Sequence, residues 1–146
     1  MRVEPVEGLP EIRPGDDLAG LLSDAADLDT DGQNGTTDVV CVASTIVSKA
    51  EARQADLVDF PASERAERIA DRIGAIAGEE KDPRFAEAVL AESAELLLEA
   101  PILLAVTHFG HITVNAGIDR SNVPDADLLL LPDDPAGSAQ RLHEAL

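Results

Sequence analysis

The chain has 146 residues, a length typical of one domain, and a formal net charge of -18, because 29 acidic residues outnumber 11 lysines and arginines. Phosphate backbones are bound by clustered cations, and no basic stripe occurs, so nucleic-acid binding is excluded. The single cysteine allows no intramolecular disulfide, and no signal peptide or membrane-length apolar run is seen, so we expect a cytoplasmic protein.

The first third of the chain is predicted to alternate short strands, loops and one helix. Asp16 or Asp17 can cap a helix that runs to about residue 28. The uncharged, β-branched run before Ser44 predicts a buried strand, in which Cys41 is a small core residue rather than a nucleophile. The segments are a strand over 2–6, a loop over 8–15, a polar loop over 29–37, and strands over 38–43 and 55–58.

The rest of the chain is predicted to contain three more helices and three more strands. Asp82 followed by Pro83 is a strong helix start, and Asp133 or Asp134 precedes Pro135 in the same way. The helices span 63–77, 82–96 and 133–146, and the strands span 102–107, 112–116 and 128–131, the first two as a hairpin. The fold class is therefore α+β or mixed α/β, with a mixed sheet and flanking helices.

The first candidate site follows the predicted strand over 38–43. Ser44 and Thr45 stand at its end, and Lys49 follows four residues after Thr45. Hydroxyls and backbone N–H groups at a strand end suit phosphate oxygens, and a lysine supplies a point charge. The Walker pattern is absent, and an ordinary turn with a surface lysine explains the same residues. The chain has only two lysines, so the retention of Lys49 favours phosphate binding.

The second candidate site is the segment NAGIDRSN, in which a strand runs into a glycine. Asp119 is a hard oxygen donor suited to Mg²⁺ or Mn²⁺, and Asn122 can hydrogen-bond a ligand from the same turn. An Asx-type turn, in which these side chains bond their own backbone, is the alternative.

The third candidate site is the proline-punctuated loop that contains Leu9, Pro10, Glu11 and Ile12. A rigid loop of this kind can line a nucleotide pocket. It can equally do no more than link a strand to a helix.

Five stretches in order resemble coenzyme F420-0:L-glutamate ligase, the F420 gamma-glutamyl ligase family, whose domain also forms the N-terminal part of a bifunctional mycobacterial ligase. They are LPEIRPGDDLAGLL, DVVCVASTIVSKAEAR, EEKDPRFAEAVLAES, HFGHITVNAGIDRSNVP and LLLLPDDPAGSAQRL. They cover most of the chain, and VSKAE and NAGIDRSN are the specific elements. The acid-rich, lysine-poor composition is similar to that of proteins from salt-loving archaea.

The resemblance implies an F420 ligase-like fold and a GTP-dependent ligase of coenzyme F420 biosynthesis. GTP phosphorylates a carboxylate of F420-0, and the amine of L-glutamate attacks the acyl phosphate; further γ-linked glutamates follow. Mg²⁺ or Mn²⁺, K⁺ and a homodimer are also implied. The residues that match GTP contacts are Leu9, Pro10, Glu11, Ile12, Ser44, Thr45, Lys49 and Asn122, and Asp119 matches a metal ligand.

The resemblance also implies a longer protein, because family members continue beyond the position of Leu146 with further metal and GTP residues. We therefore expect residues 1–146 to be the N-terminal part of a single ligase domain, with poor GTP binding and no turnover. The alternative function is a catalytically incomplete module that only binds nucleotide or dimerises.

Overall fold

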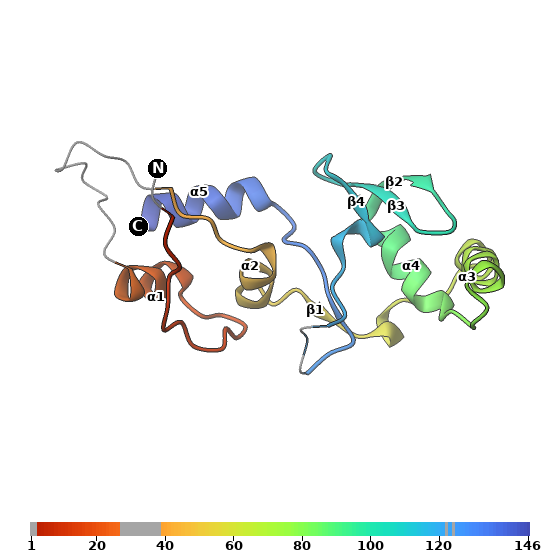
Figure 1. Ribbon diagram of the computed structural model, residues 1–146, viewed down its shortest axis with the longest axis horizontal. Helices are drawn as coiled ribbons and strands as arrows, with labels where there is room; N and C mark the ends of the chain where they lie inside the picture. Colours follow the sequence, from red (N-terminus) through yellow and green to blue (C-terminus); the bar gives the residue numbers. More distant parts are fainter. Residues whose placement is uncertain (1–2, 27–38, 122, 124) are drawn as a thin grey trace.

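The computed structural model describes residues 3–26, 39–121, 123 and 125–146, which form an elongated molecule (Figure 1). The α-helices of these residues are α1 (Leu18–Ala25), α2 (Ser44–Ala50), α3 (Glu64–Ala77), α4 (Pro83–Ala91) and α5 (Pro135–Ala145). The strands are β1 (Gln54–Ala55), β2 (Ser93–Leu98), β3 (Leu104–Thr107), β4 (Ile112–Val114) and β5 (Leu128–Leu129). Two 3-10 turns are η1 (Leu57–Asp59) and η2 (Asn115–Gly117).

The described strands form two small antiparallel sheets. One sheet pairs β1 with β5, and the other has the order β2-β3-β4. Figure 1 shows the β1–β5 pair between two groups of elements: α1, α2 and α5 on one side, and the three-stranded sheet with α3 and α4 on the other. The chain therefore passes through the middle of the molecule twice. The predicted class, α+β or mixed α/β, is confirmed, but the predicted mixed sheet is wrong, because every pairing of the described strands is antiparallel.

The helix starts follow the capping signals of the sequence. Asp17, Ser63, Asp82 and Asp134 each accept a hydrogen bond from a backbone N–H in the first turn of the following helix. In α4 and α5 a proline follows the cap, where its missing N–H leaves no intrahelical bond unmade. A cap is a local interaction, so sequence alone specifies it.

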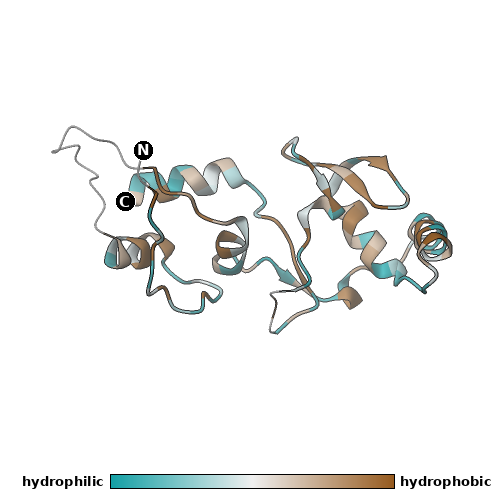
Figure 2. Cartoon of the chain, in the orientation of Figure 1, coloured by the Kyte–Doolittle hydropathy of each residue, from teal (hydrophilic) through white to brown (hydrophobic). Residues whose placement is uncertain are grey.

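The main core lies between α3, α4 and one face of the three-stranded sheet, and it extends to β5. Ala66, Val89, Ala105 and Leu128 are fully buried in it. Figure 2 shows hydrophobic residues along β2, β3 and α4. Removing these apolar side chains from water is the main stabilising contribution to this end of the molecule.

A smaller cluster joins the N-terminal loop to α1 and α2. Ile12, Leu18 and Val47 are buried together, and Leu142 of α5 packs against them. The loop that carries Glu11 is therefore anchored to α2 through its neighbour Ile12. This anchoring positions the third candidate site, which comes first along the chain.

The predicted strands over 2–6 and 38–43 are absent from the described residues, and the burial expected for the second is wrong. Residues 3–6 and 39–43 have no regular structure, Val39 is 84% exposed and Cys41 is exposed. The run 39–43 has the composition of a core strand. It has no partner strand among the described residues, so it forms no strand there. The predicted polar loop over 29–37 lies outside the described residues.

The predicted helix over 82–96 ends early. α4 stops at Ala91, and residues 93–98 form β2, which pairs with β3. The hydroxyl of Ser93 donates to the backbone carbonyl of Val89, which completes the end of the helix. Cross-strand pairing therefore prevails over a helical pattern that leucines and alanines satisfy equally well. Among the described residues, no helix has the length and apolar character needed to cross a bilayer.

Candidate functional site

Lys49 and Glu11 form an ion pair between the first two candidate segments along the chain. The Lys49 ammonium donates to the Glu11 carboxylate at 2.6 Å, and the two side chains are 6% and 64% exposed. A buried ammonium is stable only when it is paired, and the exposed carboxylate supplies a charge at the solvent edge. The Lys49 ammonium is therefore held beside the solvent-exposed carboxylate of Glu11.

The end of α2 is closed by a tight turn that fixes Lys49. Ala52 has a left-handed backbone, with φ of 57°, although it is not a glycine. The Ala52 amide donates to the carbonyl of Lys49, and the Arg53 amide donates to that of Ser48. These two bonds form a Schellman motif, which is usually built on glycine.

Backbone hydrogen bonds connect this turn to the other candidate segments. The Gly15 amide donates to the Ala50 carbonyl at 2.8 Å and ties the N-terminal loop to α2. The Leu130 amide donates to the Arg53 carbonyl at 3.0 Å, and Leu129 exchanges two bonds with Asp119. One ladder of main-chain bonds therefore runs from the Glu11 loop through α2 and β5 to Asp119.

The turn before Asp119 is left-handed over three successive residues. Asn115, Ala116 and Gly117 have φ of 53°, 52° and 75°. A side chain on Gly117 would approach Leu131 Cδ1 to 2.4 Å, so only glycine fits there. Strained backbone is common where a fold must aim a functional group, and here it directs the chain from β4 toward Asp119.

Asp119 makes the Asx-type turn that the sequence allowed. Its Oδ1 accepts hydrogen bonds from the Ser121 backbone N–H at 2.8 Å and from the Ser121 hydroxyl at 2.7 Å. These bonds hold the pKa of the Asp119 carboxyl below its ordinary range, and the charge of Lys49 lowers it further. Asp119 is therefore ionised at neutral pH and lies within electrostatic reach of Lys49.

The remaining predicted site residues fall in different places. Ile12 is 4% exposed and anchors its loop in the smaller cluster, whereas Pro10 is exposed and Leu9 is half-buried. Ser44 and Thr45 begin α2, so they stand at a helix start instead of a strand end. Asn122 lies outside the described residues.

Asp119 is the described residue that the sequence motif assigns to a divalent cation. No three side chains of His, Cys, Asp or Glu converge in the described part of the chain to form a complete protein cage. Mg²⁺ does not need such a cage, because it commonly uses one or two carboxylates with phosphate oxygens and water. The ionised Asp119 carboxylate fits that donor set.

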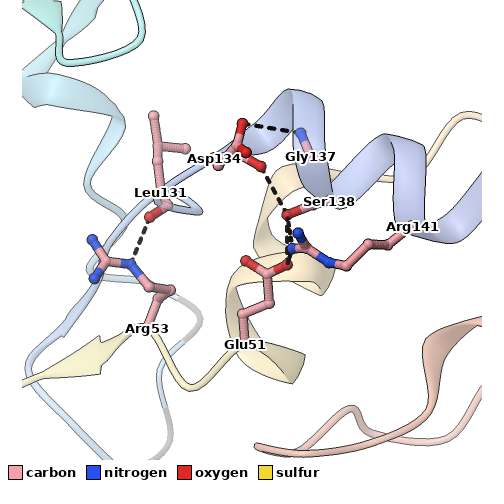
Figure 3. Close-up of polar contacts among 7 residues, drawn as sticks. All are labelled: Glu51, Arg53, Leu131, Asp134, Gly137, Ser138 and Arg141. Atoms are coloured by element: carbon pink, nitrogen blue, oxygen red, sulfur yellow. Dashed lines mark hydrogen bonds and ion pairs between the residues drawn. The ribbon is translucent and has the colours of Figure 1, made fainter.

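Sequence analysis missed the residues that hold these segments together. Arg53 and Glu51 flank the left-handed Ala52, and both make long-range contacts that Figure 3 shows. Glu51 accepts hydrogen bonds from the Ser138 hydroxyl and from Arg141 of α5. The only signal in the sequence was that Arg53 is a cation in a strongly acidic chain, which does not reveal its partners.

Comparisons with known proteins show the family to which the chain belongs. Residues 8–146 match the family F420-0:Gamma-glutamyl ligase. The chain is similar to the coenzyme F420:L-glutamate ligases of Natronomonas pharaonis (67% identical, covering 97% of this chain and 53% of the relative), Halorubrum lacusprofundi (63%, covering 100% and 56%) and Archaeoglobus fulgidus (51%, covering 100% and 55%). The chain spans about half the length of the curated relatives it matches. Because the family match covers nearly the whole chain, this protein belongs to the F420-0:gamma-glutamyl ligase family.

Proposed function

We propose that the whole protein joins L-glutamate to coenzyme F420-0 at the expense of GTP, and that this chain contributes a phosphate- and metal-binding part of the site. The family membership supports the ligase reaction, because the similar proteins are F420:L-glutamate ligases. The use of GTP and the acyl-phosphate route come from the resemblance of the sequence motifs. Addition of successive γ-linked glutamates belongs to the same proposal.

The observation that carries the proposal is the Lys49–Glu11 ion pair, whose segments are connected by main-chain bonds to Asp119. These residues come from three segments far apart in the sequence, and the Lys49 charge acts on both carboxylates. Phosphoryl transfer is catalysed mainly by positioning and by charge stabilisation, for which a held ammonium and an ionised carboxylate are suited. Because Glu11 is at the solvent edge, it can release Lys49 to an incoming phosphate.

The proposed reaction has two steps. A carboxylate oxygen of F420-0 bonds to the γ-phosphorus of GTP while the bond to the β-phosphate oxygen breaks, giving an acyl phosphate and GDP. The amine of L-glutamate then bonds to the acyl carbon, loses a proton, and releases inorganic phosphate as the amide forms. Lys49 is proposed to neutralise the phosphate oxygens in the first step.

Asp119 is proposed to hold a divalent cation against the same phosphates. Mg²⁺ or Mn²⁺ bound there supplies positive charge that offsets the charge of the phosphate groups. The Ser121 hydrogen bonds hold the orientation of the Asp119 carboxylate. K⁺, the remaining cation of the proposal, has no residue assigned to it.

A titration with fluorescent GTP in the presence of Mn²⁺ tests the proposal. We expect K49M and D119N each to weaken binding by at least about tenfold, because each removes a charged contact to phosphate or metal. K81M is the matched control, since Lys81 is the other lysine and pairs with Glu79 at the surface. Equal affinity of K49M, D119N and wild type would contradict the assignment.

An activity assay distinguishes the ligase from the alternative function, a module that binds nucleotide or dimerises without turnover. Glutamylation of F420-0 that depends on GTP and Mn²⁺ supports the ligase, and GTP binding without any glutamylated product supports the module. Sedimentation equilibrium of the same sample tests the proposed homodimer. The assay is run in concentrated KCl, which screens the large negative charge of the chain.

A further inference from the structure

The Arg53 side chain bonds three acceptors at the centre of the molecule. Its Nε donates to the backbone carbonyl of Leu131 at 2.8 Å, and its terminal nitrogen donates to Glu92 at 2.9 Å and pairs with Asp133 at 3.0 Å. The Arg53 side chain is 19% exposed. A planar guanidinium can satisfy several acceptors at fixed angles, which a lysine cannot do.

The three acceptors belong to different parts of the fold. Glu92 is the C-cap residue of α4, which belongs to the group of elements around the main core. Leu131 and Asp133 lie in the connection from β5 to α5, as Figure 3 shows for Leu131. Arg53 therefore joins the end of α4 to the strand connection that crosses the middle of the molecule.

The backbone of Arg53 joins the same segments to α2. Its amide donates to Ser48, the residue before Lys49, and its carbonyl accepts from Leu130. Leu129, the neighbour of Leu130, pairs with Asp119. Side chain and backbone of one residue thus fix the end of α2 against β5, the strand that pairs with Asp119.

We propose that Arg53 is a positioning residue, which sets the Lys49 ammonium against the Asp119 turn and so governs phosphate binding without touching the nucleotide. This inference rests on the proposed function for its GTP readout only. The ion pair of Arg65 with Glu99, by contrast, lies at the surface and connects no part of the candidate site. Surface pairs of that kind contribute little to structure.

Competitive acetylation of the two lysines measures the positioning without any ligand. Lys49 is 6% exposed and Lys81 is 38% exposed as side chains, so Lys81 serves as an internal standard in each sample. In R53M we expect the Lys49:Lys81 labelling ratio to rise at least about fivefold, because loss of the three side-chain bonds lets the end of α2 open locally. R53K keeps the positive charge but not the planar guanidinium, so its labelling ratio should lie between those of wild type and R53M.

Two control variants separate positioning from general destabilisation. R65M removes a surface pair with Glu99, and V89A creates a cavity in the main core, away from α2. At urea concentrations where R53M, V89A and R65M have equal free energies of unfolding, only R53M should raise the labelling ratio. An equal rise in V89A, or no rise in R53M, overturns the inference.

A GTP titration with Mn²⁺ then connects the positioning to the function. R53M should weaken GTP binding about tenfold, R53K less, and R65M not at all. Unchanged affinity in R53M, with a raised labelling ratio, overturns the link to phosphate binding. If wild type binds no GTP, the proposed function fails, while the labelling ratio still decides whether Arg53 positions Lys49.

Discussion

Ala52 is an alanine with a left-handed backbone, a conformation that its side chain disfavours. A left-handed φ at a residue with a Cβ costs about 1–2 kcal/mol, and this strain buys the tight end of α2 beside Lys49. Glycine is the usual residue at this position of a Schellman motif. The chain therefore accepts local strain next to its candidate phosphate lysine.

Replacing Ala52 with glycine should stabilise the protein. We expect a gain of about 0.5–1 kcal/mol in the free energy of unfolding, after the greater unfolded-state entropy of glycine is subtracted. Urea denaturation followed by circular dichroism measures it. A50G is the control: Ala50 is helical, so the same change should destabilise by about 0.5–1 kcal/mol. A loss of stability in A52G would show that the left-handed turn is not the source of strain.

Substitution of Gly117 should destabilise the protein, and the same substitution at Gly8 separates the two causes. G117A combines a left-handed backbone with a contact to Leu131, so we expect a destabilisation of at least about 2 kcal/mol in urea denaturation. Gly8 also has a positive φ of 83° but no atom within 4 Å of the added Cβ, so G8A measures the backbone strain alone. Equal losses in the two variants would mean that the contact with Leu131 does not matter.

At the level of elements, the sequence predicted helix caps better than strand pairings. Asp82 and Asp134 cap their helices as expected, and the 128–131 segment is buried, because these features follow from neighbouring residues. The end of α4 and the status of 39–43 depend on whether a partner strand is available. Local sequence does not contain that information.

The candidate site was only partly accessible to sequence reasoning for the same reason. Motif resemblance singled out Glu11, Lys49 and Asp119; the structure pairs Lys49 with Glu11 and connects their segments to Asp119 through main-chain bonds. Arg53 was missed, because its role depends on acceptors at Leu131 and Glu92 that are distant in the sequence. Side-chain hydrogen bonds to backbone carbonyls leave no trace in composition or periodicity.

The start of α4 has a pH dependence that can be measured. The Arg84 side chain donates to Asp82 and holds the pKa of that carboxyl below its usual value. Because the pKa is depressed on folding, its contribution to stability is present above the unfolded pKa and is lost as pH falls through the folded value. In R84M the Asp82 pKa should rise toward its ordinary value, as carboxyl NMR shifts would report. An unchanged pKa would exclude Arg84 as the cause; R65M is the control.

The whole molecule has a charge of -18, which should make its stability depend on salt. Like charges repel across the surface, and the screening length falls from about 10 Å at 0.1 M salt to about 3 Å at 1 M. We expect the urea midpoint to rise steadily with KCl over this range. Sucrose at matched osmolality is the control for general exclusion effects. A flat response to KCl would show that self-repulsion does not limit stability.

The central claim is that Lys49 lies at a nucleotide phosphate site, and protection of this lysine tests it most directly. Acetylation of the wild-type chain is compared with and without GTP and Mn²⁺, with Lys81 as the internal standard. We predict that nucleotide and metal together lower the labelling of Lys49 about threefold or more, while the labelling of Lys81 is unchanged. Equal labelling of Lys49 with and without saturating GTP and Mn²⁺ would contradict it.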